Sequence, residues 1–143
     1  MIGLNHVLTG TTIALIVKQP LLAAPLAFLS HFFLDITPHF GGTAAYEFGH
    51  KWFPYIMAAD AIISAGAILL ICSLVPSMAA IIVLCVLCAI LPDVLLLHYY
   101  THGRPQSWFH RAHLGMQWFE RPPGAIVEAS YLVLVVSVIF AVT

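Results

Sequence analysis

Charge is the scarcest property of this sequence, because Asp, Glu, Lys and Arg together make up only 8% of its 143 residues. An average soluble protein carries about 25% charged residues. Five basic and six acidic residues cannot cover the surface of a water-soluble globule, and 62% of the chain is hydrophobic. This composition excludes an ordinary soluble enzyme and a disordered chain. The small number of basic residues also excludes a nucleic-acid partner, which requires a basic patch.

Cysteine is also sparse, and Cys72, Cys85 and Cys88 all lie inside apolar runs. No disulfide framework follows from them, and we expect them to act as packing residues. The first residues lack the basic region and the small-residue cleavage site of a signal peptide. We therefore expect the first apolar segment to remain in the membrane.

Long apolar runs dominate the chain, and a membrane-spanning helix needs about 20 mostly apolar residues, with a range of roughly 17–25. The runs lack the alternation of strands and end at proline-containing breaks. The sequence therefore predicts an all-α polytopic membrane helix bundle, with about five transmembrane helices in one domain over residues 1–143. The predicted helices cover residues 2–17, 21–36, 54–74, 77–91 with an extension past Pro92 toward residue 98, and 124–142.

The loops carry an uneven distribution of positive charge, which predicts the orientation of the bundle. Lys51, Arg104, Arg111 and Arg121 lie in loops on the same side as the N-terminus, and Lys18 lies on the other side. The positive-inside rule places the richer side in the cytoplasm. We expect an integral protein of the cell (inner) membrane of a prokaryote, with a cytoplasmic N-terminus and an external C-terminus.

Histidine is unexpectedly frequent, with eight residues against five Lys and Arg, and the His and Asp residues gather on the N-terminal side of the predicted bundle. Ionisable residues inside a membrane cost roughly 2.5–3.5 kcal/mol each on insertion scales. A divalent metal ion is the simplest counter-ion for several carboxylates where few Lys or Arg residues are available. The candidate metal ligands are His6, His31, Asp35, His39, Asp60, Asp93, His110 and His113.

Residue spacing supports part of this set. His31 and Asp35 are four residues apart on one predicted helix face, and Pro38 allows His39 to fold back over them. His110 and His113 share a face if their stretch is helical, with Arg111 pointing elsewhere. Pro92 is expected to bend or restart the fourth helix and to aim Asp93 into the bundle.

Structural roles compete with each of these assignments. A single membrane histidine such as His6 is often a hydrogen-bond donor between helices, and Asp60 could cap a helix or pair with Arg. We interpret His50, His98 and His102 as interfacial residues, and no role is assigned to Glu120 or Glu128. The aromatic side chains near the loops are expected to form an interfacial belt: Trp52, Phe53, Trp108, Phe109, Trp118 and Phe119.

Four short patches resemble one known family. Residues 30–41 (SHFFLDITPHFG) resemble the SHxxxDxxTPxG segment of membrane-bound metal-dependent hydrolases, which include the LexA-regulated inner-membrane hydrolases. His6 followed by Thr9-Gly10 is similar to the family's N-terminal histidine and glycine. Residues 91–93 (LPD) and 110–113 (HRAH) resemble its LPD element and a shortened HRGxTH element, in a different order along the chain. The resemblance implies a metal-dependent hydrolase, with phosphoester or lipid substrates.

Our functional hypothesis is a phosphoesterase-like hydrolase with a His/Asp centre at the cytoplasmic interface of the lipid bilayer. This donor set suits Zn²⁺, with Mn or Fe as alternatives, and eight candidate donors allow one or two ions. Asp93 is the expected general base or ligand, and Arg111 is expected to hold a phosphate or lipid headgroup. Metal-ion or proton transport and a metal-stapled structural subunit remain as alternatives, and a homo-oligomer stays open.

Overall fold

The structure of the protein, a computed structural model, describes residues 1–43, 45, 50–102 and 107–143, and only the backbone of residues 97–102. Arg104 and the side chains of His98 and His102 lie outside this part. The helices are α1 (Gly3–Val17), α2 (Pro20–Ile36), α3 (Phe53–Leu74), α4 (Ala79–His102), α5 (Trp108–Met116) and α6 (Gly124–Val142), with a short 3-10 turn, η2 (Pro76–Met78). The described residues contain no strand, only an isolated bridge between His39 and Glu120. The predicted all-α fold is confirmed.

Proline and polar residues set most helix boundaries, as the sequence predicts. Pro20 occupies the first turn of α2, where its missing N–H costs no helical hydrogen bond. Thr37 ends the same helix in an extended conformation before Pro38. Lys18 closes α1 in the left-handed region, with φ of 57°, and its N–H donates to the Ala14 carbonyl.

The fourth helix differs from its prediction. α4 continues through Pro92 as far as His102, so the proline neither ends nor restarts it. Pro92 is fully buried, and its neighbours hold the helix together although Pro92 cannot donate to the Cys88 carbonyl. The polar stretch that follows contains a further short helix, α5, which carries His110 and His113 on the same nine-residue segment.

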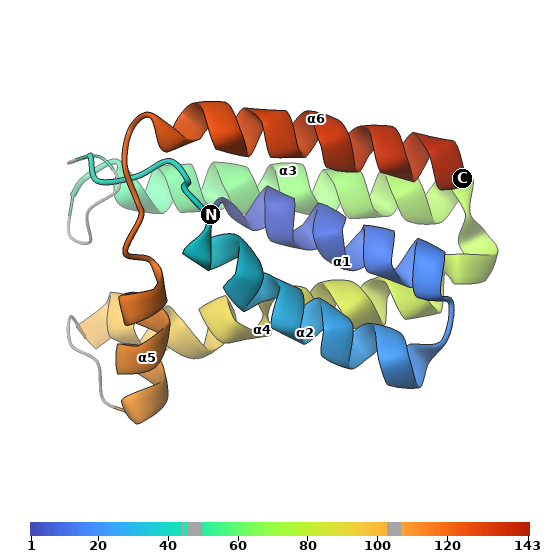
Figure 1. Ribbon diagram of the computed structural model, residues 1–143, viewed down its shortest axis with the longest axis horizontal. Helices are drawn as coiled ribbons and strands as arrows, with labels where there is room; N and C mark the ends of the chain where they lie inside the picture. The colour runs from blue at the N-terminus through green and yellow to red at the C-terminus, as the bar shows by residue number, and fades with distance from the viewer. Residues whose placement is uncertain (44, 46–49, 103–106) are drawn as a thin grey trace.

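α1 lies at the centre of the bundle and contacts α2, α3, α4 and α6 (Figure 1). α1 lies close to α4 at Gly10, where an added Cβ would lie 2.9 Å from the Cys85 carbonyl oxygen. Completely buried small side chains belong to the same core: Ala14, Ala23, Ala27, Cys85 and Ala89. Only a glycine permits the two backbones to come this close.

Three helical segments are long and apolar enough to cross a membrane: Phe53–Leu74, Pro76–Leu96 and Gly124–Val142. Their outer faces expose leucine, isoleucine and valine, which is consistent with an integral membrane protein in a lipid bilayer. α1 and α2 are apolar but shorter. At about 1.5 Å per residue they span about 22 and 25 Å, less than the roughly 30 Å of a hydrocarbon core.

The bundle has two chemically different ends. α1 begins, α2 ends and α5 lies toward one side, whereas the C-terminus and the turn between α3 and α4 lie at the other (Figure 1). The loop after α2 packs on the segment before α6, because the Arg121 N–H donates to the His39 carbonyl at 3.0 Å. A Cβ on Gly124 would overlap the His39 backbone. These contacts bring distant parts of the chain together around the end of α2.

Candidate metal centre

The first two residues of the centre lie one turn apart on α2. His31 and Asp35 have the i, i+4 spacing that places two side chains on one face of a helix. Both side chains are fully buried, and His31 Nε2 lies 3.2 Å from Asp35 Oδ2. The structure thus places this predicted pair together.

α5 supplies the third residue, His113. Ser107 is the N-cap of this helix, and its hydroxyl accepts the His110 N–H at 3.2 Å. His113 is fully buried, and its Nε2 lies 2.8 Å from Asp35 Oδ2 and 3.0 Å from His31 Nε2. Arg111 and Trp108 on the same helix are exposed, so α5 turns one face to the bundle and the other away from it.

α4 supplies the fourth residue, Asp93, immediately after Pro92. Its Oδ1 lies 3.6 Å from His31 Nε2 and 3.9 Å from His113 Nε2. The Asp93 side chain is 37% exposed, whereas those of the other three residues are at most 1% exposed. Asp93 is therefore the most exposed of the four residues and lies farther from the histidines than Asp35 does.

These four residues present one ligand atom each, and all four atoms lie within 4.8 Å of one another. Tetrahedral zinc with bonds of about 2.0 Å to nitrogen and oxygen holds its ligand atoms about 3.3 Å apart. The separations among the ligand atoms of His31, Asp35 and His113 are 2.8–3.2 Å, slightly below this value. The group can therefore hold a metal ion with small movements of side chains.

A hydrogen bond orients the His31 ring for this role. His31 Nδ1 lies 2.7 Å from the Ala89 carbonyl oxygen on α4. A carbonyl only accepts, so Nδ1 carries the hydrogen and Nε2 of the neutral ring presents a lone pair to the cluster. Ala89 thus determines which His31 nitrogen is available to a metal.

The second oxygen of Asp35 has different neighbours. Oδ1 lies 2.8 Å from the Met1 amine and 3.3 Å from His6 Nε2. The His6 ring stacks on His31 with centroids 4.1 Å apart. His6 is fully buried, and neither ring nitrogen has a hydrogen-bond partner among the described residues. His6 therefore lies beside the four-residue cluster, next to its shared carboxylate.

Asp60 lies apart from the four-residue cluster and accepts hydrogen bonds from the first residues of α1. Its Oδ2 accepts the Gly3 N–H at 2.7 Å, and its Oδ1 accepts the Leu4 N–H at 3.1 Å. These are among the first amides of α1, which have no partner within the helix itself. The structure thus gives Asp60 the helix-capping arrangement that competed with the metal-ligand hypothesis.

Three other candidate residues also lie outside the four-residue group. His39 is buried, and its Nδ1 lies 2.8 Å from the Thr37 carbonyl oxygen. His110 Nε2 lies 2.9 Å from the Leu95 carbonyl oxygen on α4. Arg111 is exposed on the outer face of α5. The His39 contact is local to the loop after α2, whereas the His110 contact attaches α5 to α4.

Glu128 is a residue near the centre that the sequence did not single out. It is buried on α6, its Oε1 accepts the Ile2 N–H at 2.6 Å, and its Oε2 accepts the Phe40 N–H at 3.3 Å. It therefore ties the start of the chain and the loop after α2 to α6. The available signal was an acidic residue one turn inside an otherwise apolar helix.

Gln117 is a second residue that sequence reasoning missed. It follows α5, and its Nε2 donates to Asp35 Oδ2 at 3.4 Å. This is the Asp35 oxygen that faces His31 and His113. Its spacing of four residues from His113 was the signal that could have revealed it.

No family model, no curated protein and no solved structure matches this chain. The function is therefore inferred from the residues of the site.

Proposed function

We propose that this protein is a membrane-embedded metal-dependent hydrolase that acts on a phosphoester or lipid-like substrate. The observation that carries the proposal is the convergence of His31, Asp35, Asp93 and His113 from three helices. Two carboxylates near each other in a membrane protein need opposite charge. The Met1 ammonium supplies one positive charge to Asp35, and none of the described Lys and Arg residues pairs with Asp35 or Asp93. A divalent ion would supply the remaining positive charge.

We propose two roles for the four residues, based on their burial and distances. His31, Asp35 and His113 are buried and close, and they resemble the three-ligand sets of catalytic zinc sites, which keep one position open. These three residues would hold a divalent ion, and the chemistry it would supply is polarisation of a phosphoryl oxygen and a pKa of about 7 for a coordinated water. Asp93, on the exposed side, is placed to accept the proton of the attacking water.

Zinc is the metal we propose, with manganese or iron as alternatives, because the donors are imidazole and carboxylate. A second ion would use Asp35 Oδ1 and His6, on the far side of the shared carboxylate, and would take the place of the Met1 amine beside Oδ1. This arrangement supports the proposal of one or two ions. Arg111, on the exposed face of α5, is the proposed contact for a phosphate or headgroup.

The proposed location is the cytoplasmic interface of a prokaryotic inner membrane, with the N-terminus in the cytoplasm. The distribution of Lys and Arg among the loops supports this orientation. The resemblance of four patches to membrane-bound metal-dependent hydrolases supports the reaction class. A site at the end of short helices meets amphipathic substrates without extracting them from the bilayer.

Two measurements on the purified protein test the proposal. Elemental mass spectrometry is expected to find a divalent metal, and 4-nitrophenyl phosphate or bis(4-nitrophenyl) phosphate is expected to be hydrolysed only by metal-loaded protein. Metal-loaded protein that hydrolyses neither ester nor any lipid phosphoester would overturn the hydrolase proposal.

A metal-stapled structural subunit is the second candidate. The observation that favours it is that the four residues join α2, α4 and α5, so an ion would hold three segments together. In that case chelation lowers the thermal stability of the protein and no hydrolysis accompanies the metal.

A further inference from the structure

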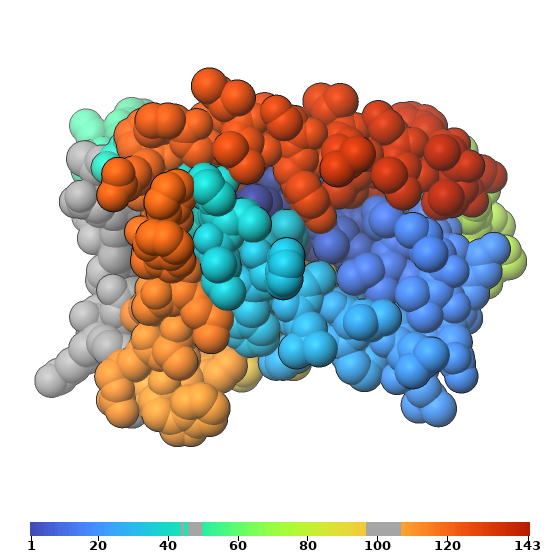
Figure 2. Space-filling view, in the orientation of Figure 1, coloured from blue at the N-terminus to red at the C-terminus, as the bar shows by residue number. Residues whose placement is uncertain are grey.

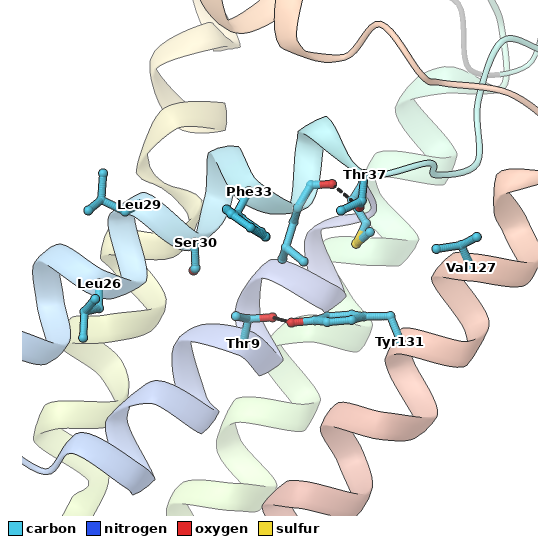
Figure 3. Close-up of a pocket in the computed structure, with 10 residues that line it drawn as sticks. Thr9, Leu26, Leu29, Ser30, Phe33, Thr37, Val127 and Tyr131 are labelled. Atoms are coloured by element: carbon cyan, nitrogen blue, oxygen red, sulfur yellow. Dashed lines mark hydrogen bonds between the residues drawn. The ribbon is translucent and has the colours of Figure 1, made fainter.

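A groove runs along the outside of the bundle between α2 and α6, over α1. Its volume is about 470 Å³, within the range of roughly 300–1,000 Å³ that is usual for ligand pockets. In the space-filling view α1, in blue, is visible between α2 and α6 (Figure 2). The side chains around the groove include Leu26, Leu29 and Phe33 of α2, Thr9 of α1, and Val127 and Tyr131 of α6 (Figure 3).

The hydroxyl groups around the groove are engaged within the protein. Thr9 Oγ1 donates to the Asn5 carbonyl at 2.6 Å and lies 2.7 Å from the Tyr131 hydroxyl. Ser30 donates to the Ala27 carbonyl at 2.8 Å, and Thr37 to the Leu34 carbonyl at 2.6 Å. None of these hydroxyls offers a spare donor to a polar ligand, so the groove favours a hydrocarbon.

The groove extends along α2 toward the end of the bundle that contains the metal centre. From Leu26 to Thr37 the groove follows eleven residues of α2, which is about 16 Å at 1.5 Å per residue. Thr37 and Met1 line it near the centre, and the Met1 amine lies 2.8 Å from Asp35 Oδ1. Phe33, on the rim, is 77% exposed. The groove thus opens toward lipid and ends at the Met1 amine, on the Oδ1 side of the Asp35 carboxylate.

We propose that this groove binds one acyl chain of a lipid phosphoester, whose headgroup lies at the Thr37 end beside the Met1 amine, and that this lipid is the substrate of the metal centre. This inference rests on the proposed hydrolase function and specifies its substrate class. The lipid enters from the bilayer between α2 and α6. A water-soluble phosphoester leaves the groove empty and is the poorer substrate.

Two serines provide matched variants for a test. Ser30 lines the groove, and Ser73 lies on the exposed face of α3; each donates to the carbonyl three residues earlier in its own helix, at 2.8 and 2.7 Å. Ser30→Phe fills the groove, whereas Ser73→Phe adds the same side chain to a surface that already contacts lipid. Both variants are first checked for metal content equal to that of the unchanged protein.

The probe is a phosphatidic acid with a photoactivatable diazirine in one acyl chain, in phosphatidylcholine vesicles that contain the protein. We expect crosslinks to concentrate on the α2 and α6 peptides that line the groove. Ser30→Phe is expected to lower their yield about tenfold, equivalent to about 1.4 kcal/mol, and Ser73→Phe to leave it unchanged. Crosslinks spread evenly over α3 and α6, or an unchanged yield in Ser30→Phe, would overturn the groove.

Hydrolysis assays distinguish failure of the groove proposal from failure of the hydrolase proposal on which it rests. In the unchanged protein we expect the long-chain phosphoester to be hydrolysed faster than bis(4-nitrophenyl) phosphate, and Ser30→Phe to remove this preference. Groove crosslinks without any metal-dependent hydrolysis would overturn the substrate assignment and the hydrolase together. Hydrolysis without groove crosslinks would overturn the groove alone. If Ser30→Phe loses its metal, Leu26→Trp, farther from His31, takes its place in both measurements.

Discussion

Asp35 uses its two oxygens for different partners, one facing His31 and His113 and the other facing Met1 and His6. Asp35→Asn preserves the size of the side chain and removes its charge. We expect it, and also His31→Ala, to lower the bound metal to less than about a tenth. Elemental mass spectrometry of the purified variants measures this directly.

His50→Ala is the control for those variants, since His50 lies in the loop after α2 and its Nδ1 only accepts a 3.4 Å bond from the Trp52 N–H. His102→Ala is a second control, at a residue whose side chain lies outside the described part. Both variants are expected to keep their metal. Equal metal content in all four variants would refute the assignment of His31 and Asp35.

Asp93 differs from its partners in being partly exposed and more distant. We expect Asp93→Asn to keep most of the metal but to lower hydrolysis about 10²–10⁴-fold, which is the usual contribution of a general base. Metal content and turnover are measured on the same preparation. Loss of metal would make Asp93 a ligand, and full metal, full activity and unchanged stability would leave it no role in the centre.

The residue-scale chemistry was only partly predictable from the sequence. The pair His31 and Asp35 followed from helical spacing alone, because one turn of helix determines their separation. Asp60 lies at a similar depth in the bundle, yet it caps α1. The height of a residue along the bundle axis follows from its position in its own helix. Which residues of other helices it contacts depends on the packing of the helices, and no local sequence pattern reveals that packing.

The same reasoning yields a prediction at the scale of the helix for Asp60. Asp60→Ala leaves the Gly3 and Leu4 amides without their acceptor and is expected to lower the free energy of unfolding by about 1–2 kcal/mol. Because the capped helix carries only His6 near the centre, metal content is expected to be retained. Thermal unfolding in detergent and elemental analysis report the two effects.

A large loss of metal with little loss of stability in Asp60→Ala would favour the metal-ligand hypothesis instead. Asp60→Asn serves as the milder variant, since an amide oxygen still accepts one of the two N–H groups. It is expected to lie between Asp60→Ala and the unchanged protein in thermal stability.

α5 depends on the centre for its place in the fold. It has nine residues, fewer than the roughly 12–15 that an isolated helix needs to be stable in water. Its buried anchor is His113, and Arg111 on its outer face is exposed. We expect removal of the metal by a chelator to speed tryptic cleavage after Arg111 by about tenfold or more. Mass spectrometry of the peptides measures the rate.

Cleavage after Lys51 is the internal control for this experiment, because Lys51 is exposed in the loop before α3 and far from α5 in the sequence. Its rate is expected to be the same with and without metal. A cleavage rate after Arg111 that is independent of the chelator would show that α5 is held without an ion.

Helix boundaries were the most predictable feature of the elements, since Pro20, Pro38 and Pro76 each interrupt hydrogen bonding in a known way. Pro92 was the exception. Its buried position inside a long helix allowed tertiary packing to outweigh the local cost, and α4 continues through it. α5 was anticipated only conditionally, because nine residues carry too little periodicity for a firm prediction.

For the whole molecule, the proposed orientation predicts that the two ends of the bundle face different compartments. Single cysteines at Gly103, which lies outside the described residues, and at Thr143 are introduced after the three native cysteines are replaced. A membrane-impermeant maleimide applied to intact cells is expected to label position 143 only. Labelling of both positions from the same side would contradict the five-helix topology.

The long reach of Asp60 and Glu128 has a consequence for biosynthesis. The N–H groups from which they accept belong to Ile2, Gly3 and Leu4, and the acceptors follow 56 to 126 positions later in the chain. Asn5 and His6 are likewise made long before their surroundings exist. The first segment must therefore wait in a polar environment or at the insertion machinery, and the bundle closes around it only when α6 has been synthesised.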